Sequence, residues 1–292
     1  MKKTIFEGVA TALYTPFNPI NKFVDYGAFS RLINRQLSAN VNALVVLGTT
    51  GEAATITEEE RREIIKFCVK EVNGRIPLIV GSGSNCTTTA VKYSQEAEDS
   101  GADGLLVVTP YYNKCNDKGL YEHYSVIAKS TSLPIIVYNV PSRTGFNVKP
   151  VVYGKLAEID NVVAIKEANC SNEQLCGAFD NVKDTLAVYC GSDDKLIDVL
   201  RRGGKGTISV ASNIIASKIV DYIINFENYC EIEFYNEIVN VLQSDVNPIP
   251  LKYMVKLLYN EGYGLRLPLT EAKNEVKEAI YKIYQKTAGK LK

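Results

Sequence analysis

Short runs of apolar, mostly β-branched residues recur along the first three quarters of the chain, and helical patterns separate them. The runs predict eight strands, at residues 9–14, 43–47, 78–80, 105–108, 135–138, 162–166, 186–189 and 207–210. Near-continuous apolar strands are typical of a sheet that is covered on its outer face, and alternation with helices favours parallel pairing. Eight such units predict an α/β fold of the (β/α)8 TIM-barrel type.

The intervening segments carry clear helix signals. Thr57 followed by Glu60 forms a capping box, and Pro150 suits the first position of a second helix. An apolar stripe then follows Thr57 at helical spacing, and Gly74 and Pro77 end that helix; the stripe comprises Ile64, Ile65, Cys68, Val69 and Val72. After residue 224 the strand pattern stops, and helices are expected at 229–243, 250–259 and 270–286. We therefore expect a barrel over 1–224 and a helical region over 225–292.

The main architectural alternative is an open, doubly wound sheet that binds a nucleotide. The glycines at 81 and 83 lack the third glycine of a dinucleotide fingerprint, and Gly206 stands where a phosphate-binding Walker A loop needs Ser or Thr. Neither cluster supports a nucleotide site.

Composition excludes several classes of function. The chain has 33 basic and 33 acidic residues with no long basic cluster, which argues against nucleic acid as a partner. No apolar run approaches the roughly 20 residues of a membrane span, and no signal-peptide core follows Lys2 and Lys3, so we expect no membrane association and a cytoplasmic protein. Seven cysteines without a C-x-x-C pair indicate reduced, mostly packed thiols.

His123 is the only histidine in the chain. Its isolation excludes histidine-dependent triads and the usual histidine-rich zinc sites, so no metal is expected. We expect His123 to be structural or to face solvent from a helix.

Lys166 stands at the polar end of an apolar strand, an unusual place for an ammonium group. An ordinary lysine has a pKa of about 10.4, so only about 0.1% of it is the neutral amine near pH 7.4. Burial lowers that pKa and produces a nucleophile. Taken alone, Lys166 fits a strand-end lysine that bends to solvent or pairs with Glu167 better than it fits a nucleophile.

Active sites of such barrels lie at the C-terminal ends of the strands, where this chain places several polar segments. The 48–52 turn reads Gly-Thr-Thr-Gly-Glu, residues 109–113 include paired tyrosines, and 138–145 read Tyr-Asn-Val-Pro-Ser-Arg-Thr-Gly. Together with Ile165-Lys166-Glu167 and the 247–252 segment, these motifs occur in a consistent order over the whole chain. The sequence resembles the class I, Schiff-base-forming family that includes dihydrodipicolinate synthase and N-acetylneuraminate lyase.

The resemblance implies a mechanism and a set of site residues. Lys166 would form an imine with pyruvate, without any other cofactor, and hydroxyls would carry the protons; these hydroxyls belong to Tyr138, Thr49 and Tyr112. Pyruvate would be bound by Thr50 through its hydroxyl and backbone N–H, and by a backbone contact at Ile208, with Gly191 leaving space beside it. Glu52 and Glu167 are expected to position the loop or to lie outside the site.

Arg143 is the residue from which we predict the aldehyde substrate. Its guanidinium can hold a carboxylate through two charge-assisted hydrogen bonds, which suits aspartate semialdehyde and does little for a neutral polyol. The resemblance therefore implies the synthase branch of the family, which condenses pyruvate with L-aspartate 4-semialdehyde in diaminopimelate and lysine biosynthesis. A lyase for sialic or 2-keto-3-deoxy sugar acids is one alternative, and a catalytically silent barrel that binds a keto acid is another.

The resemblance also bears on assembly and regulation. The residue matching Tyr112 reaches into the neighbouring subunit's active site, which implies a homodimer or homotetramer. Lysine-inhibited members carry a glutamate four residues after the position of Asn85 and histidines after the Gly-Glu motif. Here Thr89, Glu58 and Arg61 occupy those positions, so we expect weak or absent inhibition by lysine.

Overall fold

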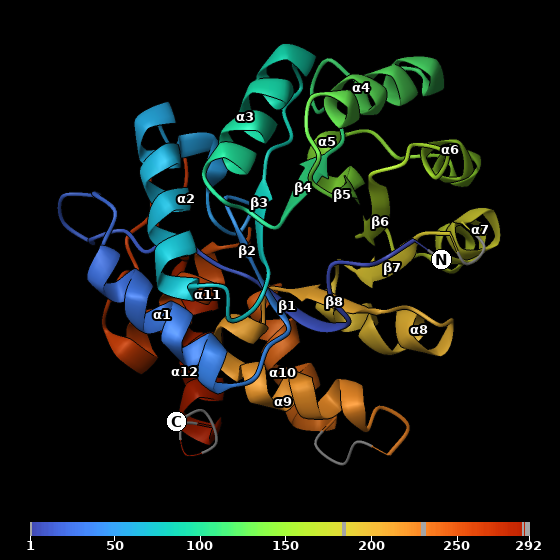
Figure 1. Cartoon of the computed structure of the whole chain (residues 1–292). Coiled ribbons are helices and arrows are strands. Elements are labelled where there is room, and N and C mark those ends of the chain that lie inside the picture. The colour runs from blue at the N-terminus through green and yellow to red at the C-terminus, as the bar shows by residue number, and fades with distance from the viewer. Residues whose placement is uncertain (1, 183–184, 229–231, 288, 290–292) are drawn as a thin grey trace.

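Eight parallel strands form a closed barrel with helices around its outside (Figure 1). The structure is a computed structural model that describes residues 2–182, 185–228, 232–287 and 289. Each strand pairs with the next along the chain, and β1 also pairs with β8 to close the barrel. The predicted TIM barrel is therefore confirmed.

The observed strands begin and end within two residues of the predicted ones. They are β1 (Gly8–Ala12), β2 (Ala43–Val46), β3 (Leu78–Gly81), β4 (Gly104–Val108), β5 (Ile135–Asn139), β6 (Val162–Glu167), β7 (Ala187–Cys190) and β8 (Gly206–Ser209).

Helices follow the strands and then continue beyond the barrel. They are α1 (Tyr26–Ser38), η1 (Ala53–Thr55), α2 (Glu58–Val72), α3 (Thr87–Asp99), α4 (Asp117–Lys129), α5 (Pro141–Thr144), α6 (Pro150–Leu156), α7 (Asn172–Val182), η2 (Asp193–Lys195), α8 (Leu196–Arg201), α9 (Ser212–Ile224), α10 (Ile232–Leu242), α11 (Ile249–Tyr259) and α12 (Asn274–Thr287). The capping box of α2 is present, with the Glu60 N–H donating to Thr57 Oγ1 at 3.2 Å. Pro150 opens α6, as predicted.

Two apolar layers hold the barrel together. Side chains such as Ala10, Ile79, Ile136 and Ile208 fill its interior. A larger layer, which includes Val9 on β1, packs the outer face of the strands against the helices. This double burial is why the strands read as continuous apolar runs.

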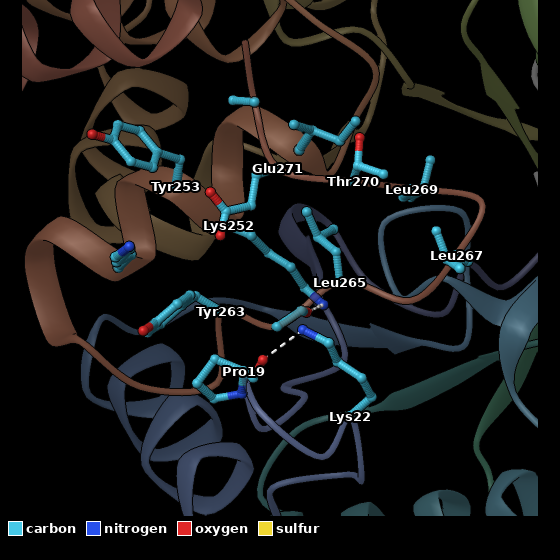
Figure 2. A pocket seen from close by; sticks show the side chains of 14 residues that line it. Pro19, Lys22, Lys252, Tyr253, Tyr263, Leu265, Leu267, Leu269, Thr270 and Glu271 are labelled. Atoms are coloured by element: carbon cyan, nitrogen blue, oxygen red, sulfur yellow. Dashed lines mark hydrogen bonds between the residues drawn. The ribbon is translucent and has the colours of Figure 1, made fainter. Parts of the chain in front are cut away.

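The C-terminal helices α10, α11 and α12 pack together beside the barrel (Figure 1). The predicted start of α10 at 229–231 lies outside the described residues. The helix predicted from Thr270 begins instead at Asn274. In the segment before it, Leu269, Thr270 and Glu271 line a pocket together with Tyr253 of α11 and Tyr263 (Figure 2). Ala272, which lines the same pocket, is buried. Because α9 ends at Ile224, we keep the division into 1–224 and 225–292 as a proposal.

Single residues largely match their expected environments. His123 is buried on α4, and its Nδ1 lies 2.9 Å from Thr87 Oγ1, which is a structural role. Of the six described cysteines, all of which are free thiols, Cys86 and Cys176 are exposed, so those two depart from the expected packing; Cys230 lies outside the described residues. No helix in the described part of the chain is long and apolar enough to cross a membrane.

Candidate active site

The C-terminal ends of the strands surround a recess of about 530 Å³, which we call the catalytic recess. Parallel strands in a barrel all end on the same face, so segments far apart in the sequence converge there. Six of the residues predicted from the sequence line this recess: Thr49, Thr50, Tyr138, Arg143, Lys166 and Gly191.

A local irregularity in β6 determines which way Lys166 points. Ile135 on β5 pairs with Val162, but the next residue, Ile136, pairs with Ala164, so β6 contains one extra residue at Val163. Side chains alternate between the two faces of a strand, and an inserted residue reverses that alternation. Beyond the irregularity, Ala164 lies in the barrel interior and Lys166 follows it on the same face.

Lys166 is buried beside an aromatic ring. Its side chain is 5% exposed, and Nζ lies 4.3 Å from the centre of the Tyr138 ring, on the neighbouring position of β5. No carboxylate of the described residues forms an ion pair with Lys166. Lys252, the other buried lysine among the described residues, pairs with Glu52. An amine buried without an ion-pair partner is the arrangement that a nucleophilic lysine needs.

Asn247 connects the groups expected to bind carboxylates, by donating one hydrogen bond and accepting another. Asn247 Nδ2 donates to Thr50 Oγ1 at 3.0 Å, and Arg143 Nη2 donates to the Asn247 carbonyl at 2.8 Å. Arg143 lies on the short helix α5, which Pro141 opens, and no described carboxylate pairs with it. Its guanidinium therefore retains donors for a ligand.

Thr49 and Tyr138 also line a second recess of about 490 Å³, which we call the side recess. This recess extends to Arg61, Thr89 and Tyr111. Among the residues that the structure describes, no hydrogen bond joins the hydroxyls of Thr49, Tyr138 and Tyr112. The expected proton relay is therefore not assembled within one chain.

Two predicted site residues do not line the catalytic recess. Tyr112 is 90% exposed and has a φ of 70°, in a turn that projects from the end of β4. Ile208 is buried in the barrel interior, where packing alone explains it. Their expected roles remain proposals.

Gly191 has a packing reason to be glycine. A Cβ atom at this position would lie 2.8 Å from the Glu167 carbonyl oxygen and 3.0 Å from the Ala168 Cβ. The same carbonyl accepts a hydrogen bond from the Gly191 N–H at 2.7 Å. A larger residue would push apart β6 and β7 next to Lys166.

Glu167 faces away from the catalytic recess and braces the outer side of β6. Its carboxylate accepts hydrogen bonds from Asn139 Nδ2 at 2.8 Å, the Tyr153 hydroxyl at 2.7 Å, Gln174 Nε2 at 3.0 Å and the Asn169 N–H at 2.7 Å. Burial raises the pKa of Glu167, and these donors oppose the shift. With both oxygens occupied, Glu167 positions the end of the strand.

Sequence reasoning missed Asn247 and Asp193 as parts of the site. Asp193 lines the catalytic recess at the end of β7 and accepts hydrogen bonds from the N–H groups of Val210 and Ala211. Burial raises its pKa, while these bonds and the Lys166 charge lower it. Each residue had one available signal in the sequence. Asp193 lies three residues after the end of β7, and Asn247 directly precedes Pro248, just before α11.

A closed (β/α)8 barrel with a buried lysine on its sixth strand and an arginine beside the same recess defines a class of enzyme, the Schiff-base-forming lyases and synthases. Comparison with known proteins specifies the family. Residues 5–287 match the model of the dihydrodipicolinate synthetase family. The chain belongs to that family.

Individual relatives resemble this chain in sequence and structure along nearly its whole length. A 4-hydroxy-tetrahydrodipicolinate synthase of Alkaliphilus oremlandii is 47% identical, over 91% of this chain and 93% of its own. The crystal structure of dihydrodipicolinate synthase from Thermotoga maritima has a TM-score of 0.93 at 39% identity and covers 98% of this chain and 99% of its own. The crystal structure of a lysine-bound dihydrodipicolinate synthase from Cyanidioschyzon merolae has a TM-score of 0.92 at 34% identity. It covers 98% of this chain and 99% of its own.

Proposed function

We propose that this chain is a 4-hydroxy-tetrahydrodipicolinate synthase, which condenses pyruvate with L-aspartate 4-semialdehyde in diaminopimelate and lysine biosynthesis. The observation that carries the proposal is the buried Lys166, which has no ion-pair partner among the described residues and shares one recess with Arg143. The names of the relatives support the same reaction. Beyond the covalent imine on Lys166, the proposed reaction uses no cofactor.

The proposed reaction begins with the neutral Lys166 amine, which attacks the ketone carbon of pyruvate. Loss of water gives an imine, whose positive nitrogen withdraws electrons and makes a methyl proton removable. The resulting enamine attacks the aldehyde carbon and forms the new carbon–carbon bond. Hydrolysis of the imine or attack by the product's own amine then frees Lys166.

The surrounding residues have separate proposed roles. Tyr138, Thr49 and Tyr112 transfer protons, because hydroxyls both donate and accept hydrogen bonds. Thr50 holds the pyruvate carboxylate, and Arg143 holds the carboxylate of the aldehyde substrate. Weaker proposals assign Ile208 a backbone contact to pyruvate and Gly191 the space beside it.

One assay tests the substrate assignment. Purified protein is incubated with pyruvate and either aspartate semialdehyde or a neutral sugar aldehyde, and consumption of each aldehyde is measured. The proposal expects turnover with aspartate semialdehyde only. Turnover with the sugar aldehyde would favour the sugar-acid lyase, whereas no turnover and no borohydride-trapped pyruvate adduct would favour a silent barrel.

Substitution of Tyr112 tests both the relay and the assembly. We propose a homodimer or homotetramer in which Tyr112 enters the neighbouring subunit's site. Tyr112→Phe should lower kcat while leaving thermal stability unchanged, because an exposed hydroxyl contributes little to folding. The matched control is Tyr281→Phe, an exposed tyrosine on α12. Wild-type kcat in Tyr112→Phe would remove this residue from the relay.

Inhibition by lysine should be weak or absent. Arg61 and Thr89 line the side recess, and Glu58 is already paired with Lys92 at 2.7 Å. A ligand ammonium would therefore lack a free carboxylate partner, a contact typically worth about 1.5 to 3 kcal/mol. Half-inhibition by sub-millimolar lysine in a steady-state assay would contradict this. Thr89→Glu, which restores a carboxylate, should lower the half-inhibiting concentration.

A further inference from the structure

The turn that carries Thr49 and Thr50 ends in an unusual backbone conformation. Glu52 has φ 52° and ψ 38°, in the left-handed region, and its N–H donates to the Thr49 carbonyl at 3.1 Å. A residue with a side chain remains in this region only where its surroundings hold it there. The conformation of the 48–52 turn therefore depends on what fixes Glu52.

Lys252 on α11 fixes the Glu52 side chain through an ion pair. Both side chains are 1% exposed, and the Lys252 Nζ also donates to the Gly264 carbonyl at 2.6 Å. The second Glu52 oxygen accepts a hydrogen bond from the Arg266 N–H at 3.2 Å. Figure 2 shows the Lys252 side chain extending from α11 toward Leu265. The Phe17 ring, with its centre 4.3 Å from Nζ, covers the ammonium.

The segment before α11 also holds the 48–52 turn, at Thr50. Asn247, two residues before α11, donates to Thr50 Oγ1. Thr15 Oγ1 donates to the Gly51 carbonyl at 2.6 Å, from the barrel side. The turn is therefore held at Thr50 and Glu52 by residues that lie about 200 positions later in the sequence.

We propose that Lys252 is a positioning residue for pyruvate: through Glu52, it holds the 48–52 turn so that the hydroxyl and N–H of Thr50 face the substrate carboxylate. The inference rests on the proposed function, which assigns that carboxylate to Thr50. Lys252 is absent from the described residues that line the catalytic recess, so its effect passes through Glu52. Pyruvate binding should respond to its loss more than aldehyde binding does.

The test removes both charges of the pair together, in Lys252→Met/Glu52→Gln. Either charge left alone would be buried without a partner and could prevent folding, whereas the double variant leaves none. Borohydride trapping at increasing pyruvate concentration measures half-saturation of the adduct by intact mass. We expect half-saturation and the KM for pyruvate to rise roughly tenfold, while the KM for the aldehyde at saturating pyruvate changes less than twofold.

Lys256→Met is the matched control, since this lysine lies one turn further along α11 and lines the same pocket as Lys252. This variant should leave the half-saturating pyruvate concentration unchanged. If the double variant does not fold, Glu52→Gln is tested alone. This single variant can fold because burial lowers the pKa of Lys252 to about 8, so that the lysine can stay as a neutral amine beside the glutamine.

Three outcomes are decisive. The positioning role would be overturned if the tested variant folds and its half-saturating pyruvate concentration stays within twofold of that of the wild type. A lowered melting temperature with an unchanged KM would do the same, because it would show a contribution to stability only. Wild-type protein that forms no pyruvate adduct would overturn the proposed function and this inference with it.

Discussion

Lys166→Met should lose turnover by roughly 10⁴-fold or more, the scale seen when a covalent nucleophile is removed. Methionine keeps the length of the side chain but cannot form an imine. Borohydride treatment with pyruvate should add the mass of one reduced pyruvate to the wild-type chain and none to the variant. Because the amine has no ion-pair partner among the described residues, its removal should not lower the free energy of unfolding.

The control for this experiment is Lys155→Met, an exposed lysine on α6. It should retain both turnover and the trapped adduct. An adduct that persists in Lys166→Met would place the Schiff base on another lysine and would refute the assignment.

Arg143→Ala should produce the second largest loss, confined to the aldehyde substrate. A charge-assisted hydrogen bond typically contributes about 1.5 to 3 kcal/mol, so kcat/KM for aspartate semialdehyde should fall roughly 10- to 150-fold. Trapping of the pyruvate adduct should need the same pyruvate concentration as in the wild type, since Lys166 and Thr50 remain. Steady-state kinetics in both substrates separates the two effects.

Arg143→Lys refines the interpretation of that result. A lysine keeps the positive charge but cannot form the paired hydrogen bonds of a guanidinium, so an intermediate kcat/KM is expected. If both variants retain wild-type kcat/KM for the aldehyde, Arg143 does not bind its carboxylate, and the sugar-acid alternative becomes stronger.

The barrel could be predicted because its determinants are local. Each strand is buried on both faces and so appears as one apolar run, and the capping box at Thr57 and Glu60 marks a helix start without reference to the rest of the chain. Lys166, Tyr138, Thr49 and Arg143 could be placed together for a related reason, since a barrel brings all of its C-terminal strand ends to one face.

Contacts between distant segments could not be predicted in this way. The hydrogen bond between Asn247 and Thr50 and the ion pair between Lys252 and Glu52 depend on how α11 docks on the barrel, which no local pattern specifies. The exposure of Tyr112 likewise has no local signal, because exposed loops favour polar residues over tyrosine.

The extra residue at Val163 in β6 makes the chemistry of the site depend on strand length as well as on residue type. If every residue of β6 were kept and alternated regularly from Val162, which packs in the outer layer, the two faces would be exchanged beyond Val163. Ile165 would then face the barrel interior, and Lys166 would turn outward toward the helices. The register of β6 is therefore as necessary to the proposed site as the Lys166 amine itself.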